Sequence, residues 1–572
     1  MNDETPRRLQ ARRGFFVRYK GKTLLSTIDP IDQAQRIVQT ARIFNRTLYV
    51  CPSPLLGYGL SSLVERSTED SAVLGLETDP LLMALSEGEI DGELRNHPKF
   101  RLFCTRSPAE LCSFVRKTWG PRRFRRVELV QSGAGAQFDR GLYENLIEAL
   151  ERDLAIDWGN AMTLTKLGRR YSRNMVYNLP LLLESPPSAV PDAQGPMLVL
   201  GAGPSLDGAL EELDRILPLS GPQKERGFSI LCVDTALGAL LARGIEPDAV
   251  VALEAQQWNL RDFLGARTGE FRLWMDLSAL PATAQAVRGP VSVFFTEWTA
   301  LAIFDRLRRA QLIQTELPPL GSVGLSAVAL ALRKTDAPLV LAGLDFSYLP
   351  GRYHAKGSPS HTEALLRVHR FLSPFDPGGA FRPRVIKIAG KEEGVYTDPV
   401  LRGYRDLFER EFGSSSRLYD MGNFGLPLGI PRVTVEEAAR ILRSSATDQR
   451  MAPKGGKQRL GSTPDEGLKK TALKGGLQNF LRDEQERLVR LRDLLTGATG
   501  GSVPESEVRR LILEVDYVWA HFPEYAAADR SAKLVLEPSF LKRLRAELDP
   551  FIKYYRIARQ ELEDRDPTRP WS

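Results

Sequence analysis

With 572 residues, the chain is long enough for roughly three or four domains, each with a core of its own. Its 78 basic and 71 acidic residues leave a net charge of +7, and its shares of hydrophobic (42%) and charged (26%) residues are typical of globular proteins. No apolar run approaches the roughly 20 residues of a membrane span, the start lacks the apolar core of a signal peptide, and the four cysteines form no Cys-x-x-Cys pair. These features exclude a membrane-spanning chain and a disulfide framework, and we expect a cytoplasmic protein without a transmembrane segment.

Residues 1–190 are expected to form an N-terminal Rossmann-like α/β domain. A strand at 48–51 precedes a loop at 52–59 and a helix, and a second strand, 72–79, ends in acidic residues. This order is typical of half a Rossmann fold. The loop contains two prolines and only two glycines, so it departs from a working cofactor loop. A structural or acceptor-binding role is therefore favoured over a second bound cofactor.

The densest basic run, residues 116–126, interleaves arginines with aromatic residues. This composition suits nucleic acid or a phosphate-bearing ligand, although a solvated basic loop is the commoner explanation. No nucleic-acid motif accompanies the run, and we expect no nucleic-acid partner.

The most informative stretch begins at Met197. A short apolar run, 197–200, breaks at Gly201 and Gly203, and Ser205 opens a helical stretch. The pattern predicts a buried strand, a tight turn and a helix N-terminus, which together direct backbone N–H groups and the positive end of a helix dipole at one spot. A nucleotide or phosphate site fits this pattern, and so does a structural strand-to-helix turn.

Two more predicted strands end in acidic residues. The strand at 228–233 runs into Asp234 and Thr235, and the strand at 249–253 ends at Glu254. Ligands of open α/β sheets bind at the carboxyl edge of the strands, so these side chains are candidates for ligand contact. The alternatives are a helix cap for Asp234 and a solvated loop position for Glu254.

Further along, Gly321-Ser-Val-Gly324 precedes an apolar helix that ends near Leu332, and a strand at 338–342 runs into a polar loop, 343–356. The glycine-serine segment is a second candidate nest of backbone N–H groups. The polar loop gathers donors and titratable groups that are uncommon in a purely structural turn: Ser347, Tyr348, Arg352, Tyr353, His354 and Lys356.

The remainder of the chain divides at a polar, glycine-rich segment. Residues 446–475 are expected to be a flexible linker. Beyond it, residues 476–572 are expected to form a helical domain with helices at 476–495, 508–519 and 538–562, because their apolar residues recur at helical spacing.

Three motifs carry a resemblance to a known family: Gly201-Ala-Gly-Pro-Ser-Leu206, Gly321-Ser-Val-Gly324 and Gly343-Leu-Asp-Phe346. In this order and spacing they resemble the motility-associated factor (Maf) flagellin glycosyltransferases. Those proteins share a core with the 6-hydroxymethylpterin diphosphokinase MptE-like proteins, and the core is similar to bacterial sialyltransferases that use CMP-sialic acid. The resemblance covers about residues 196–445. It implies a central sialyltransferase-like, Rossmann-type α/β catalytic domain over 191–445, between the N-terminal α/β domain and the C-terminal helices.

The resemblance also implies roles for individual residues. The first motif would cradle the donor nucleotide, and the second would close over the cytidine or its phosphate. Three nucleotide-binding asparagines of the sialyltransferases correspond to Ala202, Asp234 and Glu254. The nucleotide-binding candidates are Gly201, Ala202, Gly203, Pro204, Ser205, Asp234, Thr235, Glu254, Gly321, Ser322 and Gly324.

Transfer from a CMP-sugar requires charge stabilisation on the departing phosphate and removal of a proton from the acceptor, and needs no metal in principle. The histidine base of the sialyltransferases would fall near 395–397, where this chain has none. The catalytic candidates are therefore His354, as base or phosphate donor, Tyr348, as a substitute for a family tyrosine, and Asp345, as the anchor of their loop. His361 is a second candidate base, and Asp398 is a third, with helix capping as its alternative role.

We therefore expect a glycosyltransferase that moves a nonulosonic (sialic-acid-like) sugar from a CMP donor to serine or threonine of flagellin or another protein. One rival is an MptE-like diphosphokinase that moves pyrophosphate from ATP to a pterin, although a small pterin would not need two flanking domains. The other is a non-catalytic assembly factor that binds flagellin or nucleotide. The donor reaction requires no cofactor, while Asp234, Glu254 and Asp345 leave Mg²⁺ binding open.

Overall fold

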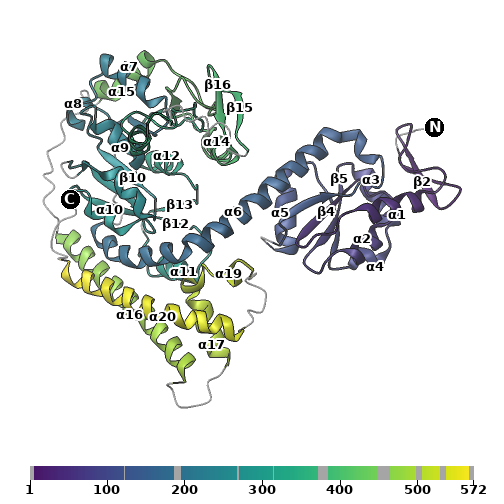
Figure 1. The fold of residues 1–572 in the computed structure, drawn as a ribbon. Coiled ribbons are helices and arrows are strands. Elements are labelled where there is room, and N and C mark those ends of the chain that lie inside the picture. The colour runs from purple at the N-terminus through teal and green to yellow at the C-terminus, as the bar shows by residue number, and fades with distance from the viewer. Residues whose placement is uncertain are drawn as a thin grey trace. The chain divides into compact units, whose positions relative to one another are not determined.

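The computed structural model describes residues 5–120, 123–185, 195–266, 269–313, 315–371, 384–448, 464–497, 505–527 and 536–565. Two compact units make up the chain: Met1–Lys166 with Ala520–Val535, and Leu167–Trp519 with Leu536–Ser572. Each contains a parallel sheet with helices, which confirms the predicted α/β class (Figure 1). In these described ranges, no helix is both long and apolar enough to cross a membrane.

The first unit contains a four-stranded parallel sheet with the order β6-β5-β4-β7. A smaller antiparallel sheet of three strands precedes it in the chain. The strands are β1 (Arg7–Gln10), β2 (Phe15–Tyr19), β3 (Lys22–Thr23), β4 (Thr47–Pro52), β5 (Ala72–Glu77), β6 (Phe100–Cys104) and β7 (Arg126–Leu129). The helices are α1 (Pro30–Thr40), α2 (Leu60–Arg66), α3 (Pro80–Glu89), α4 (Gly92–Asn96), α5 (Pro108–Trp119), η1 (Gly135–Asp139), the first part of α6 (Arg140–Asn178) and α19 (Pro523–Ala527).

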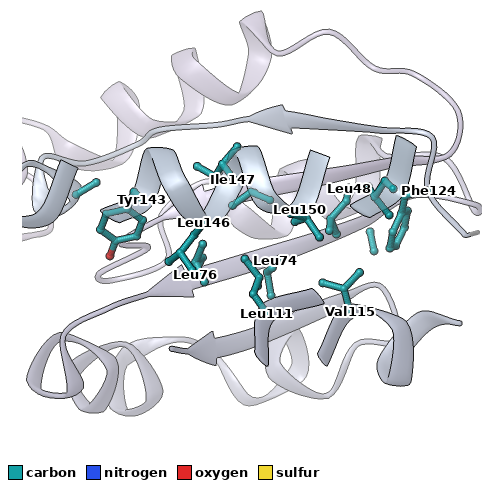
Figure 2. Packing of buried hydrophobic residues seen from close by; sticks show 14 residues of the cluster. Leu48, Leu74, Leu76, Leu111, Val115, Phe124, Tyr143, Leu146, Ile147 and Leu150 are labelled. Atoms are coloured by element: carbon teal, nitrogen blue, oxygen red, sulfur yellow. The ribbon is translucent and has the colours of Figure 1, made fainter. Parts of the chain in front are cut away.

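Both faces of the four-stranded sheet are covered. Leu48 and Val50 of β4 belong to a buried cluster with residues of α5 and α6, and Figure 2 shows Leu48 next to Leu150 of α6 and Phe124. Tyr49 and Cys51, the alternate residues of the same strand, pack with α1 and α2 on the opposite face. Because side chains alternate along a strand, a strand buried on both faces reads as a continuous apolar run, which is how β4 was predicted.

The loop after β4 is packed by the protein's own side chains. Leu55 and Leu56 are buried in a cluster with Val17 and Tyr19 of β2. A Cβ on Gly135 would overlap the hydroxyl of Ser53, so that glycine is required for a close approach to the loop. This packing supports the structural role predicted for the loop.

The second unit is built on an eight-stranded sheet in which every pair is parallel, with the order β13-β12-β11-β10-β9-β8-β14-β17. From β8 to β13 each new strand is added on the same side, and the chain then returns to place β14 on the other side of β8. The strand order therefore reverses between β8 and β14. The strands are β8 (Met197–Leu200), β9 (Ser229–Val233), β10 (Ala249–Ala252), β11 (Arg272–Asp276), β12 (Val291–Thr296), β13 (Glu316–Leu317), β14 (Leu339–Ala342) and β17 (Leu418–Asp420).

Helices and one antiparallel hairpin surround this sheet. The predicted strands at 197–200, 228–233, 249–253 and 338–342 all match observed strands to within one residue. The hairpin strands are β15 (Ile386–Ala389) and β16 (Gly394–Thr397). The helices are η2 (Leu179–Glu184), α7 (Leu206–Ile216), α8 (Gln223–Arg226), α9 (Asp234–Leu241), η3 (Gln257–Phe263), α10 (Pro281–Gln285), α11 (Ala302–Arg309), α12 (Val323–Lys334), α13 (Pro359–Leu366), α14 (Pro399–Phe412) and α15 (Val435–Asp448).

The C-terminal helices belong to this second unit, where α16 packs along α20 (Figure 1). They are α16 (Pro464–Thr496), α17 (Glu505–Glu514), α18 (Asp516–Trp519) and α20 (Pro538–Asp564). Half of the predicted linker, residues 449–463, lies outside the described residues. Its described parts are helical, since residues 446–448 belong to α15 and residues 464–475 to α16. The predicted boundaries at 190, 445 and 475 stay predictions.

A buried ionic cluster joins the C-terminal helices to the sheet. Glu484 of α16 has a fully buried side chain and accepts from Arg306 of α11 through Nε at 2.6 Å and Nη2 at 2.8 Å. Arg487 Nη1 donates to the same carboxylate at 2.7 Å. The carboxylate of Asp516 accepts from the backbone N–H of Ala302, at the start of α11, at 3.0 and 3.1 Å. The helical part is therefore bonded to the edge of the sheet through groups that are costly to leave unpaired.

Candidate functional site

The loops after β8 and β14 meet where the strand order reverses, the position at which open α/β sheets bind ligands. Gly201 N–H donates to Ala342 O, and Gly203 N–H donates to Gly343 O, each at 2.8 Å. Gly343 has a φ of +73°, which few residues other than glycine adopt. The first and third sequence motifs are thus in direct backbone contact.

Asp345 occupies the N-terminus of α7. Its Oδ2 accepts from Ser205 N–H at 2.8 Å and its Oδ1 from the Ser205 hydroxyl at 2.6 Å, while Gly343 N–H donates to that hydroxyl at 3.2 Å. Burial raises the pKa of Asp345 to about 6, against the bonds from Ser205 and the charge of Lys391. The anion at this helix N-terminus is therefore the protein's own carboxylate. Asp345 anchors its loop, as the resemblance implied.

Gly203→Ala is expected to lower the free energy of unfolding by about 2–3 kcal/mol, because the new Cβ would overlap Asp345 Oδ2 and lie 2.7 Å from Gly343 O. Gly208→Ala, inside α7, is the matched control. A Cβ there meets no atom within 4 Å, so this change is expected to stabilise the protein by about 0.5–1 kcal/mol. Denaturant unfolding of both variants measures the difference. Equal stability of the two variants would contradict the close contact between the loops.

The second glycine motif joins the same place. A Cβ on Gly324 would lie 2.7 Å from Leu344 Cδ2, and one on Gly201 would lie at the same distance from the same atom. Gly321, with a φ of +67°, lies against the ring of Tyr404. Ser322 is the N-cap residue of α12, but its side chain makes no capping hydrogen bond. Within the described ranges, the Ser322 side chain therefore leaves the first N–H groups of α12 uncapped, whereas at α7 Asp345 accepts from the backbone N–H of the N-cap residue Ser205.

Acidic side chains lie at the carboxyl ends of β9 and β10. Asp234 is only 1% exposed, and its Oδ1 accepts from Thr235 N–H at 2.8 Å and from the Thr235 hydroxyl at 3.2 Å. Its Oδ2 is buried and has no hydrogen-bond partner in the part of the chain that the structure describes. Burial, followed by the negative charge of Asp262, raises the pKa of Asp234 to about 7. This carboxyl is thus held in an environment that disfavours its charged form.

The same edge contains groups that sequence reasoning missed. Asp262, on η3, is buried, and burial raises its pKa to about 6 against the nearby Arg261. The charge of Glu254 adds to the effect of burial in raising the pKa of Tyr171 and of Tyr404. None of these missed residues lies in a recognisable motif; Asp262 and the two tyrosines come from η3, α6 and α14.

Asp234→Asn is expected to change the pH dependence of stability. The folded-state pKa is raised above the value of about 3.9 in unfolded chains, so the unfolded state loses its proton first and the free energy of unfolding falls as pH rises from about 4 to about 7. From pH 5 to pH 7, the free energy of unfolding of the wild type should therefore fall by about 2–3 kcal/mol relative to that of the variant, which lacks the titrating carboxyl. Denaturant unfolding at both pH values tests this, with the exposed Asp305→Asn as the control. A constant difference between variant and wild type would count against the prediction.

The segment that carries His354 is hydrogen-bonded to α7 and to the loop before it. The next residue, Ala355, donates its N–H to Ala202 O at 2.9 Å, and Lys356 N–H donates to Asp207 Oδ1 at 3.1 Å. The ring Nδ1 lies 3.0 Å from the Ser360 hydroxyl. Burial and the charge of Arg261 lower the pKa of His354, so the imidazole is neutral at pH 7 and able to accept a proton.

The other candidates, Tyr348, Asp398 and His361, make contacts that belong to the fold itself. Tyr348 is buried, packs on Tyr353 with ring centroids 4.9 Å apart, and exchanges backbone hydrogen bonds with Tyr396 at 2.9 and 3.0 Å. Asp398 caps α14 by accepting from two backbone N–H groups, which confirms its capping alternative. His361 lies in the first turn of α13, where Ser358 is the cap. In the described residues, no three His, Cys, Asp or Glu side chains are placed to hold a metal ion together.

A known protein family, a sequence relative and a solved structure are among those similar to this chain. The family of 6-hydroxymethylpterin diphosphokinase MptE-like proteins matches residues 173–351. An uncharacterized protein of Treponema pallidum (strain Nichols) is 31% identical over 564 residues, which cover 96% of this chain and 94% of that protein. The solved structure of a Maf glycosyltransferase from Magnetospirillum magneticum AMB-1 aligns with a TM-score of 0.54 and 15% identity, over 98% of this chain and 90% of that one.

These similarities confirm the resemblance in fold to a Maf protein and the MptE-like core. The structural alignment covers both flanking regions as well as the central sheet, so the likeness extends beyond the three glycine motifs. The chain belongs to the same protein family as the Treponema pallidum protein, with an MptE-like central domain and the fold of a Maf glycosyltransferase.

Proposed function

We propose that this protein is a glycosyltransferase that moves a nonulosonic sugar from a CMP donor to a serine or threonine hydroxyl of flagellin in the cytoplasm. The observation that carries the proposal is the arrangement at the reversal of strand order. There the loop after β14 carries a neutral, half-buried His354 and contacts the first turn of α12 through Leu344 and Gly324, and the buried Asp234 follows β9 at the carboxyl edge of the same sheet. The whole-chain fold that it shares with a Maf glycosyltransferase supports the same reaction class.

The chemistry of these groups suggests how a cytidine nucleotide would bind. Carboxylates accept hydrogen bonds, so Asp234, Asp262 and Glu254 suit the ribose hydroxyls and the amino group of cytosine. The same carboxylates would repel a phosphate. The uncapped N–H groups of α12 instead offer donors and the positive end of a helix dipole, so the phosphate is expected at Ser322 and Val323.

The acceptor step requires a base. The neutral imidazole of His354 would take the proton from the acceptor hydroxyl as that oxygen attacks the anomeric carbon, and CMP would leave with the bonding electrons. Since the departing group is a stable phosphate monoester, stabilisation of its charge by backbone N–H groups is sufficient in principle without a metal.

Calorimetric titration with CMP and ATP, with and without Mg²⁺, tests the proposal. We expect CMP to bind without Mg²⁺ and more tightly than ATP. The Asp262→Asn variant should weaken CMP binding, because it replaces one of the two acceptor oxygens with an NH₂ donor and removes the charge; the exposed Asp305→Asn should leave it unchanged. Tight, Mg²⁺-dependent ATP binding would instead favour a diphosphokinase, the activity in the name of the matching family. Binding of neither nucleotide would favour a non-catalytic assembly factor.

A further inference from the structure

Lys391 is a buried lysine next to the candidate site. It stands in the turn between β15 and β16, and its side chain is 1% exposed. Its ammonium lies 2.6 Å from Asp420 Oδ2, and that side chain is 3% exposed. A buried ammonium is costly unless a carboxylate compensates it, and Asp420 supplies that carboxylate.

The pair extends to the N-terminus of α7. A Cβ on Gly422 would lie 3.0 Å from Lys391 Nζ, 3.1 Å from Asp420 Oδ1 and 3.5 Å from the Ser205 hydroxyl, so this glycine lies among all three groups. Ser205 in turn is bonded to Asp345, whose pKa the charge of Lys391 lowers and that of Asp420 raises. Ser205, Asp345, Lys391 and Asp420 thus form one group, the switch-point cluster.

Backbone contacts tie the same segments together. Lys391 N–H donates to Gly425 O at 2.8 Å, and Leu426 N–H donates to Asp345 O at 2.9 Å. Gly425 has a φ of +99°, and a Cβ there would lie 2.7 Å from the Cα of Asp345. The hairpin, the loop after β17 and the loop after β14 therefore meet around the switch-point cluster.

The charges of the cluster balance only when the lysine is present. Asp420 and Asp345 are both buried, and the α7 dipole compensates only the one bonded to Ser205. Other charged groups on these loops have partners elsewhere: Arg352 donates to Pro204 O at 3.5 Å, and Asp207 pairs with Arg243. Loss of the ammonium would leave two buried carboxyl groups to repel one another across the loop that leads to His354.

We infer that Lys391 is a positioning residue of the candidate site: its buried ammonium holds Asp420 and Asp345 against the N-terminus of α7 and so fixes the loop that carries His354. The inference rests on the proposed function, because Lys391 acts through this loop without touching substrate. It gives the hairpin of β15 and β16 a role in the site.

Hydrogen–deuterium exchange of residues 346–358 tests the inference without any ligand. At pH 7.5, Lys391→Met is expected to speed exchange of these amides at least 10-fold. The double variant Lys391→Met/Asp420→Asn should return to within about 3-fold of wild type, because a neutral pair leaves less uncompensated charge. At pH 5.5 the exchange rate of Lys391→Met should exceed that of the wild type by a smaller factor, because Asp345 takes up a proton. Lys470→Met, which removes another buried lysine of the same unit, is the control and should leave this loop unchanged.

CMP titration of the same variants links the loop to the site. Lys391→Met should weaken CMP binding at pH 7.5 at least 10-fold, and the double variant should recover most of it. Three results would each overturn the inference. These are exchange at the wild-type rate in Lys391→Met, exchange in the double variant that stays as fast as in Lys391→Met, and equally fast exchange of this loop in Lys470→Met. If the wild-type protein binds no CMP, the proposed function fails, while the exchange results still decide whether Lys391 fixes the loop.

Discussion

His354→Ala is expected to reduce sugar transfer by about 10²–10⁴-fold, the usual contribution of a positioned general base. The affinity for CMP should stay within about 3-fold of wild type, because the imidazole acts on the acceptor hydroxyl and the nucleotide contacts come from other residues. Burial and Arg261 keep the pKa of His354 below its ordinary value, so the wild-type rate should stay constant at neutral pH and fall only on the acid side of the ordinary histidine range, where the imidazole gains a proton. Single-turnover transfer from a CMP-sugar measures this effect.

His369→Ala is the matched control for this experiment. His369 is exposed and follows α13, and its Nδ1 accepts from Phe371 N–H at 3.2 Å. Its removal should leave both the rate and the pH profile unchanged. Transfer at the wild-type rate in His354→Ala would show that another residue is the base.

Glu484→Ala is expected to lower the free energy of unfolding of the second unit by about 3–5 kcal/mol, because it leaves the buried guanidinium of Arg306 without its bidentate partner. Arg487 would lose a partner as well. The change is far from the glycine motifs in sequence, yet it should unfold the C-terminal helices and the sheet edge together. Denaturant unfolding followed by tryptophan fluorescence can measure this, since Trp519 is buried on α18.

The control is Glu507→Ala on α17. Glu507 pairs with Arg490 at 3.1 Å, and that arginine is half exposed, so the loss is expected to be below about 1 kcal/mol. Losses of similar size in Glu484→Ala and Glu507→Ala would show that the buried cluster does not join the two parts.

Four strands of the central sheet, β8, β9, β10 and β14, could be predicted because each is a short apolar run that a glycine or an acidic residue ends. The other four strands, β11, β12, β13 and β17, were not predicted. The predicted helix at 508–519 is divided in the structure into α17 and α18, which end and begin around Val515. Periodicity does not reveal such a break, because buried residues continue on both sides of it.

The candidate site was predicted in part. The three glycine motifs, Asp234, Glu254 and His354 do lie at one edge of the sheet. The sequence pattern left both a ligand site and a structural turn open for Gly201 and Gly203, and it did not foresee that these glycines allow the loop after β8 to contact the loop after β14. Their contact with nucleotide stays a prediction.

Lys391, Asp420 and Asp262 could not be predicted from local patterns. Lys391 stands in a charged stretch, Lys391-Glu-Glu393, which is typical of a solvated turn. Its burial depends on a contact between the hairpin and the residues after β17. No sequence motif links these two segments. Asp420 is similar, since its partner comes from another loop.

The return of the chain from β13 to β14 has a consequence during synthesis. Ser205 and Asp345 are 140 residues apart in sequence, so α7 leaves the ribosome long before the carboxylate that caps it. At about 5–20 residues per second, the gap is roughly 7–28 s. Throughout that interval β8 is an edge strand of the nascent sheet, because β14, its neighbour on one side, has not yet been synthesised. A chaperone that shields such edges would therefore be most needed while the middle of the message is translated.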